Sequence, residues 1–172
     1  MNSDGLKIRT ATNLDCDAVQ ELVFSVLVEY GLTPEPDGTD ADLRDLVGVY
    51  IGPGGIFEVL VDEHQRIVGC YGLYAISDTV CELRKMYLHP GVRGQGWGKS
   101  VLIRAIEQAK QIGFLTLDLE TANCLKEAIA LYRKFGFVEK SGAPNVERCD
   151  LVFTMDLTKS DVLPSAGIKI LN

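Results

Sequence analysis

Apolar residues recur at regular spacings along most of this chain of 172 residues. In three stretches they stand three and four positions apart, the period at which an amphipathic helix buries one face. The apolar faces of these predicted helices run over 18–30, 101–112 and 125–135. A glycine follows each stretch directly, and a glycine after the last periodic residue is a common helix stop. The pattern therefore predicts three helices with defined ends.

Shorter apolar segments, alternating with polar residues or bounded by turn signals, indicate β-strands. The predicted strands cover 6–10, 57–61, 66–76, 80–89, 115–120 and 151–157. A short additional helix is predicted at 40–47, after a loop of Pro, Gly and Asp at 33–39. Strands and helices thus follow one another along the chain, which is typical of the α/β class.

Length and charge narrow the classes of protein to which the chain can belong. The length suits one domain, and a hydrophobic content of 47% is usual for a globular chain. The net charge of −7 argues against nucleic acid as the main partner, because a phosphate backbone requires clustered Lys and Arg. Apolar runs stay well below the ~20 residues of a membrane span, and the polar N-terminus lacks the core of a signal peptide. We therefore expect a cytoplasmic protein with no nucleic-acid or membrane partner.

The cysteines and histidines point away from disulfides and metals. Five cysteines are scattered along the chain without a Cys-x-x-Cys pair, and the two histidines are not clustered. An odd number of dispersed cysteines is typical of reduced thiols in the cytosol. We expect no metal site, because structural metal sites need clustered ligands.

Residues 93–99, Arg-Gly-Gln-Gly-Trp-Gly-Lys, are the most informative stretch and stand between a predicted strand and a predicted helix. A glycine loop that opens a helix leaves backbone N–H groups without intrahelical partners. These donors, together with the positive end of the helix dipole, favour phosphate. Arg93 and Lys99 add positive charge. The stretch therefore predicts a site for a phosphate-bearing ligand.

Spacing distinguishes the known kinds of phosphate loop. A P-loop ending at 98–100 would need its first glycine where Arg93 stands. A dinucleotide fingerprint would need its third glycine where Lys99 stands, although Glu120, about 20 residues further on, keeps it as a weak rival. The pattern Arg/Gln-x-x-Gly-x-Gly/Ala fits residues 93–98 without adjustment. A glycine-rich turn that binds no ligand is the remaining interpretation.

The fitting pattern resembles the coenzyme A pyrophosphate loop of the GNAT acyltransferase superfamily. A second segment, Ala-Leu-Tyr-Arg-Lys-Phe-Gly-Phe at 130–137, is similar to the aromatic-Tyr-x-x-x-Gly-Phe pattern after that family's fifth strand. Two ordered motifs are more specific than either alone. The resemblance covers 6–157, is sharpest over 82–137, and implies the GNAT fold, a mixed central sheet with helices on both faces. It assigns 1–158 to an acetyltransferase domain and 159–172 to a C-terminal tail.

The resemblance also implies an activity. The family moves an acetyl group from acetyl-coenzyme A to a primary amine by direct attack, without a metal, and the acceptor is a small-molecule or peptide amine. Tyr132 would be the acid that protonates the leaving thiolate, and Glu82 the base. The implied cofactor contacts are Met86, Tyr87, Leu88, Arg93, Gly94, Gln95, Gly96, Trp97, Gly98, Lys99 and Asn123.

Each of these roles has a plainer alternative. Tyr132 lies on the apolar face of its helix and could be a core aromatic. Glu82 could face solvent, with Asp118 or Glu120 as the base in its place. Asn123 could cap the following helix.

The acceptor and the assembly are less constrained by the residues. Acidic side chains gather between the first two predicted helices, at Glu35, Asp37, Asp40, Asp42 and Asp45. They would favour a cationic acceptor such as a polyamine, aminoglycoside or lysine side chain, or else they belong to a solvated loop with a capped helix. A catalytically weak coenzyme A-binding module is the alternative function. Residues 168–171, Ile-Lys-Ile-Leu, could form a strand or a contact in a homodimer.

Overall fold

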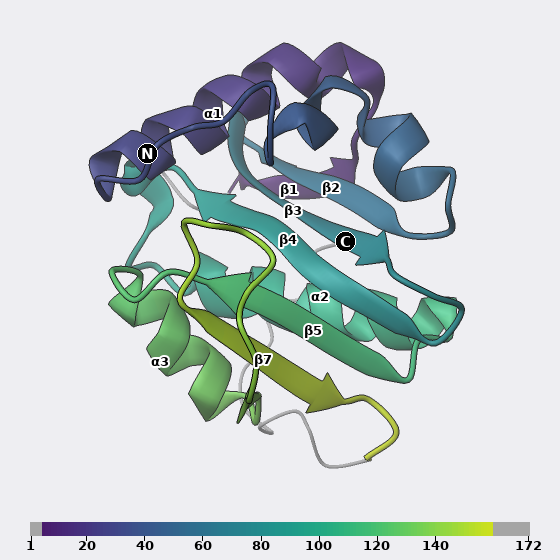
Figure 1. Cartoon of the computed structure of the whole chain (residues 1–172). Helices are drawn as coiled ribbons and strands as arrows, with labels where there is room; N and C mark the ends of the chain where they lie inside the picture. Colours follow the sequence, from purple (N-terminus) through teal and green to yellow (C-terminus); the bar gives the residue numbers. More distant parts are fainter. Residues whose placement is uncertain (1–4, 160–172) are drawn as a thin grey trace.

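The computed structural model describes residues 5–159, which form a seven-stranded sheet flanked by helices (Figure 1). The strands are β1 (Lys7–Thr10), β2 (Ile56–Val61), β3 (Ile67–Ala75), β4 (Val80–Leu88), β5 (Thr116–Thr121), β6 (Val138–Lys140) and β7 (Leu151–Asp156). The helices are α1 (Cys16–Glu29), α2 (Trp97–Ile112) and α3 (Lys126–Lys134), with short helical turns η2 (Asn13–Asp15), η3 (Ala41–Arg44), η4 (Val47–Ile51) and η5 (Pro90–Val92). The tail contact expected at 168–171 lies outside the described residues.

The sheet is mixed. Its strand order is β1-β2-β3-β4-β5-β7-β6. β4 and β5 run parallel, and every other neighbouring pair is antiparallel. Parallel neighbours need a crossover connection, which α2 supplies between β4 and β5.

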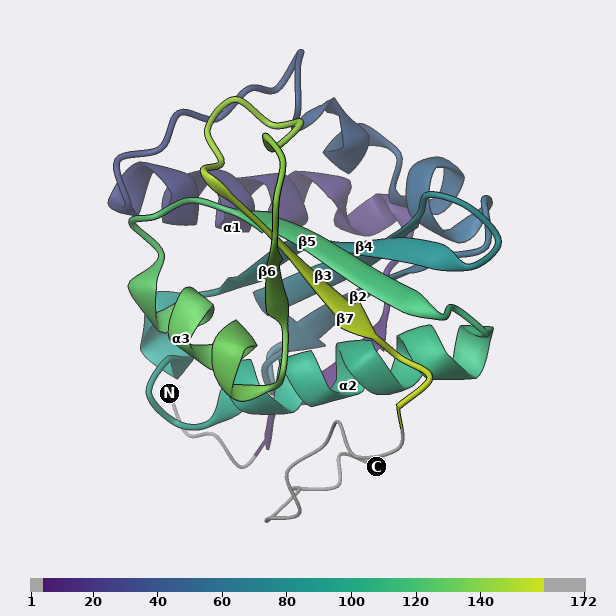
Figure 2. The same ribbon diagram turned by 60° about the horizontal axis from the view of Figure 1, so that its bottom comes forward.

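Helices cover both faces of the sheet. α1, with η3 and η4, lies on one face, and α2 and α3 lie on the other (Figures 1 and 2). Core clusters accordingly lie on both faces: Leu102 and Phe153 belong to the cluster under α2 and α3, whereas Val23 and Phe57 belong to the cluster under α1. A third, smaller cluster contains Trp97. This arrangement confirms the predicted α/β fold with a mixed central sheet and helices on both faces.

The structure differs from the sequence patterns in one short segment and one short strand. The helix predicted at 40–47 is instead two turns, η3 and η4, broken at Asp45 (φ −146°, ψ 78°). The Asp45 carboxylate accepts hydrogen bonds from Asn13 Nδ2 and from the Gly48 amide, both at 2.8 Å. Such bonds compete with helical hydrogen bonding. No pattern predicts β6, because its three residues are all exposed and do not alternate.

β4 and β5 separate before they end. Their pairing runs only from Val80 to Leu83 on β4. Lys85 then adopts a φ of 54°, which is rare for a residue with a side chain, and the β3–β4 register shifts beside it. This bulge re-aims the last residues of β4, so the carboxyl ends of the two parallel strands stand apart.

Candidate active site

A cavity of about 730 Å³ occupies the space between the separated ends of β4 and β5. Its walls come from β4, the glycine loop at 93–98, α3, and the loops that precede η3 and β7. Both predicted catalytic residues, Tyr132 and Glu82, line it. The glycine loop and the predicted acid and base therefore open into one space.

The glycine loop presents backbone groups to this cavity. Gly94 and Gly96 have φ angles of 73° and 89°, in the left-handed region that favours glycine. Within residues 5–159, the backbone N–H groups of 94–96 donate to no backbone acceptor, and those of 97 and 98 stand in the first turn of α2, where a helix offers no partner. A Cβ at Gly94 or Gly96 would meet no atom within 4 Å, so the space beside the loop is open. With α2 beginning at Trp97, these donors and the helix dipole suit an anionic group such as a pyrophosphate.

The side chain of Arg93 is held by the protein. Its two terminal nitrogens donate to the Glu29 carboxylate at 2.7 and 2.9 Å, and its Nε donates to the Leu88 carbonyl oxygen at 2.8 Å. The guanidinium also lies 5.5 Å from the centre of the Tyr30 ring. Arg93 thus ties the glycine loop to the end of α1 and to the end of β4. Its contact with a cofactor stays a prediction.

Four other predicted cofactor residues occupy different settings. Gln95 donates from Nε2 to a carbonyl oxygen of the preceding turn at 3.0 Å. Trp97 is buried in an apolar cluster under the loop, and Lys99 lies in the first turn of α2. Asn123 is exposed, and it does not line the cavity. Its backbone N–H donates to Asp150 Oδ2 at 2.7 Å. For all four residues, contact with a cofactor stays a prediction.

The last residues of β4 form one wall of the cavity. Met86, Tyr87 and Leu88 line it, and beyond Leu83 this edge of β4 has no paired strand within the described residues. The side chains of Met86 and Leu88 pack on the core under α2 and α3, and that of Tyr87 on the core under α1. The wall is therefore an open strand edge, which suits a ligand with amide groups.

Tyr132 is a buried residue of α3 that faces the cavity. Only 7% of it is exposed, and its ring packs edge to face on Phe137 with the centroids 5.7 Å apart. Among the described residues its hydroxyl makes no hydrogen bond. Burial, followed by the nearby Cys149 thiol, raises the pKa of Tyr132 above its usual value. The hydroxyl is therefore a protonated donor at neutral pH.

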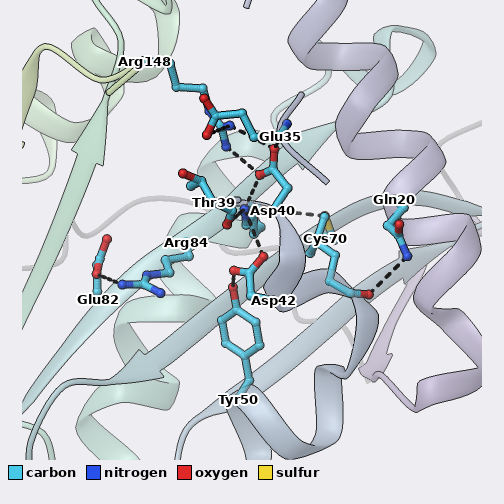
Figure 3. Close-up of polar contacts among 12 residues, drawn as sticks. Gln20, Glu35, Thr39, Asp40, Asp42, Tyr50, Cys70, Glu82, Arg84 and Arg148 are labelled. Carbon is cyan, nitrogen blue, oxygen red and sulfur yellow. Dashed lines mark hydrogen bonds and ion pairs between the residues drawn. The ribbon is translucent and has the colours of Figure 1, made fainter. Parts of the chain in front are cut away.

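Glu82 is a buried carboxylate on β4 with one nearby cation. Its Oε2 accepts a hydrogen bond from Arg84 Nη2 at 2.6 Å, and both side chains line the cavity (Figure 3). The Arg84 guanidinium lies over the Tyr74 ring, 4.0 Å from its centre. Within residues 5–159 the other oxygen of Glu82, Oε1, accepts no hydrogen bond. It is available to a ligand.

The two alternative bases have structural partners. Asp118 accepts hydrogen bonds from Thr154 Oγ1 at 2.5 Å and from Lys140 Nζ at 3.2 Å. Glu120 lines the cavity, but its carboxylate accepts three hydrogen bonds of 2.7 to 3.0 Å from the loop residues 145–146. Because these oxygens hold neighbouring elements in place, Glu82 is the better placed of the three carboxylates.

A buried ionic cluster closes the side of the cavity near η3. We call Asp40, Lys85, Arg148 and Asp42 the Asp40 cluster. Asp40 is fully buried and contacts Lys85 Nζ, and it accepts hydrogen bonds from both terminal nitrogens of Arg148 at 2.9 and 2.6 Å (Figure 3). Lys85 Nζ is also 3.2 Å from Asp42 Oδ1, and Tyr50 donates to Asp42 Oδ2 at 2.5 Å. Burial opposes ionisation of Asp40, but the hydrogen bonds from Arg148 and the Glu35 amide outweigh it and lower its pKa.

The remaining acidic residues between α1 and β2 are also engaged. Asp37 forms an ion pair with Arg44 at 2.5 Å, and Asp45 accepts the hydrogen bonds that end η3. Glu35 lies 4.0 Å from Arg148. These carboxylates stabilise their own loop, but the loop is not the solvated one with a capped helix that the sequence offered, because Asp40 is fully buried and η3 has no side-chain cap. These carboxylates do not form a free acidic surface for a polycation.

Four residues of the cavity wall were not predicted as site residues from the sequence. Arg84 and Lys85 are adjacent charged residues in a strand whose other members, apart from Glu82, are mostly apolar, and that contrast was a usable signal. Arg148 lies in a segment without periodicity, 108 positions from Asp40, so nothing local marks it. Cys149 also lines the cavity. Burial, followed by the charge of Glu120, raises the pKa of its thiol to about 11, which leaves it mostly protonated.

The described residues give no sign of a metal centre or a membrane span. Residues 5–159 hold no group of three or more His, Cys, Asp or Glu that could bind a metal ion. No helix in this part of the chain is long and apolar enough to cross a bilayer.

Comparison with known proteins identifies the family. Residues 21–137 match the model of the Acetyltransferase (GNAT) family. The uncharacterized N-acetyltransferase YjgM of Escherichia coli (strain K12) is 40% identical over 135 residues, which are 76% of this chain and 80% of that protein. Similar solved structures include a GNAT acetyltransferase from Staphylococcus aureus Mu50, with a TM-score of 0.83 and 23% identity over 88% of this chain and 99% of that one. A phosphinothricin acetyltransferase from Sinorhizobium meliloti in complex with acetyl-coenzyme A has a TM-score of 0.70 and 21% identity over 96% of both chains. The chain therefore belongs to the GNAT acetyltransferase family.

Proposed function

We propose that this protein transfers the acetyl group of acetyl-coenzyme A directly to a primary amine, with Glu82 as the base and Tyr132 as the acid. One observation carries the proposal. The donor-rich glycine loop, the Glu82 carboxylate and the Tyr132 hydroxyl all line the same cavity between β4 and β5. A thioester is already activated, so positioning an amine against it supplies much of the rate acceleration.

The backbone of the glycine loop would bind the pyrophosphate of the co-substrate. The N–H groups of 94–98 supply the donors, and the N-terminus of α2 supplies a favourable dipole. The open edge of β4 at 86–88 would hydrogen-bond the amides of the pantetheine arm. These contacts would bring the thioester between Tyr132 and the bulge at Lys85, where the two strands separate.

The proton transfers follow from the two side chains. An amine arrives as an ammonium at neutral pH, and Oε1 of Glu82 accepts one proton from it, directly or through water. The nitrogen forms the new C–N bond with the acetyl carbon, and the C–S bond breaks with its electron pair going to sulfur. The Tyr132 hydroxyl gives its proton to that sulfur, and the proton that the new amide nitrogen loses restores the phenol through solvent. One proton is released in each turnover.

Replacing Tyr132 by Phe tests the acid. The ring and its packing remain, and only the donor is lost. The turnover number should fall by about 10²–10⁴, because general acid catalysis has that typical magnitude. The Kd for acetyl-coenzyme A and the Tm should stay near wild type. Tyr74→Phe is the matched control, because it removes a phenol oxygen outside the cavity lining. Near-full turnover in Tyr132→Phe under chemistry-limited conditions would show that the tyrosine is structural.

Replacing Glu82 by Gln tests the base. The turnover number should fall at neutral pH, where the amine is protonated, and recover as the pH rises and free amine accumulates. A wild-type pH profile in Glu82→Gln would assign the base elsewhere.

Tight coenzyme A binding without thiol release from any amine would instead support the catalytically weak coenzyme A-binding module. The five unpaired cysteines, all in described residues, support action in the cytoplasm.

A further inference from the structure

On the β4 side of the cavity the charged side chains form balanced pairs. Glu82 is paired with Arg84, and in the Asp40 cluster two cations, Lys85 and Arg148, face two carboxylates. Neither set leaves a net charge. A polycation would gain little from such a wall, whereas a molecule that carries both an ammonium and a carboxylate can match the separated charges.

We propose that the acceptor is an α-amino carboxylate, and that Arg84 binds its carboxylate while Glu82 receives its ammonium. This inference rests on the proposed acetyl transfer and adds the substrate class. Arg84 would be a specificity-determining residue of the acceptor site.

The Arg84 guanidinium has unused hydrogen-bond donors and a fixed orientation. A guanidinium carries five N–H donors, and within the described residues Arg84 uses one, from Nη2 to Glu82. Its stacking on Tyr74 holds the plane of the group, and a third of its side chain is exposed to solvent. An oriented guanidinium with unused donors is well suited to bind a carboxylate.

Arg148 is less suited to that role. Both of its terminal nitrogens donate to Asp40, and only 12% of its side chain is exposed. Asp40 already compensates its charge. We therefore assign the carboxylate to Arg84 and leave Arg148 to hold the loop before β7 against the loop before η3.

The spacing of the charges selects the α-isomer. Arg84 Nη2 and Glu82 Oε2 are 2.6 Å apart, so the positive and negative groups of the wall are in direct contact. An ammonium and a carboxylate joined through one carbon are similarly close, and they can lie antiparallel to this ion pair. An ω-amino acid holds its two charges several bonds apart and can meet both groups only by folding back.

Matched acceptors test the inference. Leucine and 3-methylbutylamine differ only in the carboxylate, and α-aminobutyrate and γ-aminobutyrate differ only in its position. With acetyl-coenzyme A present, kcat/KM is measured for each by thiol release, and the products are verified by mass spectrometry. We expect the α-amino acid to be preferred within each pair. In Arg84→Gln the ratio of kcat/KM for leucine over 3-methylbutylamine should fall at least tenfold, since hydrogen bonds to charged groups are typically worth that much or more.

The change in this ratio, rather than its absolute value, is the decisive measurement. The two amines differ in basicity, but that difference is the same for every enzyme variant and cancels. Arg66→Gln removes the same charge on the hairpin between β2 and β3, away from the cavity, and should keep the wild-type ratio. Arg84→Lys keeps the charge, should lose only part of the preference, and serves if the Gln variant does not fold.

Other results would overturn the inference. A ratio in Arg84→Gln within twofold of wild type would remove Arg84 as the carboxylate contact. If wild type acetylates 3-methylbutylamine or spermidine at least as well as every α-amino acid, the substrate class is wrong while acetyl transfer stands. If coenzyme A binds and no amine is acetylated, the proposed function fails and this inference fails with it. A calorimetric titration with coenzyme A separates these two failures.

Discussion

Asp40→Asn should cause a large loss of stability, because it removes a charge from a buried ionic cluster. Asp40 is fully buried and pairs with two cations, Lys85 and Arg148. The other carboxylates near them are Asp42, 3.2 Å from Lys85, and the partly exposed Glu35, 4.0 Å from Arg148. Asparagine has nearly the same shape and can keep part of the hydrogen bonding. It removes the charge, so Arg148 keeps only the partly exposed Glu35 carboxylate at 4.0 Å, and most of its charge is uncompensated.

The magnitude follows from the burial of the partners. The side chains of Lys85 and Arg148 are 5% and 12% exposed, so water can solvate little of the uncompensated charge. Breaking a buried ion pair from one side typically costs about 3–5 kcal/mol. Because the amide retains some hydrogen bonds, we expect about 3 kcal/mol of the free energy of unfolding to be lost. For a domain of this size that corresponds to a decrease in Tm of roughly 6–12 °C.

Urea unfolding at pH 7 and a thermal scan measure this effect. Asp37→Asn is the matched control, because it makes the same chemical change in the same loop. Asp37 and its partner Arg44 are 87% and 53% exposed, so the control should shift the Tm by no more than about 1 °C. The reasoning is refuted if Asp40→Asn and Asp37→Asn have the same Tm.

Two further predictions concern the glycine loop and acid stability. Gly98 lies in the first turn of α2, where a Cβ would meet Leu88 and Leu131 side chains only at ordinary distances of 3.8 and 3.9 Å. Gly98→Val should therefore fold, and its larger side chain should reach into the cavity. Calorimetry should show coenzyme A binding about tenfold more weakly. Unchanged affinity would place the cofactor elsewhere. The hydrogen bonds from Arg9 lower the pKa of Asp15 to about 2, so its contribution to stability is present above the unfolded pKa of about 3.9 and is lost as pH falls toward 2. Asp15→Asn should cost about 1–2 kcal/mol at pH 7, after allowing for the exposure of Arg9, and much less at pH 2; an equal loss at both pH values would contradict this assignment.

The sequence predicted the fold better than the acceptor side of the site. Periodicity and glycine stops located α1, α2 and α3, because the forces that form a helix act between neighbours in sequence. The position of the glycine loop could also be predicted, because its hydrogen-bond donors are backbone groups whose arrangement depends on local conformation. The Asp40 cluster could not be predicted, because Lys85 and Arg148 lie 45 and 108 positions from Asp40 and meet it only in the folded chain. The bulge at Lys85 carries no glycine signal either, and only tertiary contacts hold that backbone conformation.

The contact between Asp40 and Arg148 has a consequence for synthesis on the ribosome. The chain emerges from its N-terminus, so α1, the bulge of β4 and the whole glycine loop are made before Arg148 leaves the exit tunnel. Contacts between distant parts of a chain generally form late. We expect a nascent chain to form its glycine loop before the side of the cavity at the Asp40 cluster is closed. Completion of the chain would then act as a checkpoint, because the loop that carries Arg148 and Cys149 supplies the last wall of the cavity that we propose as the active site.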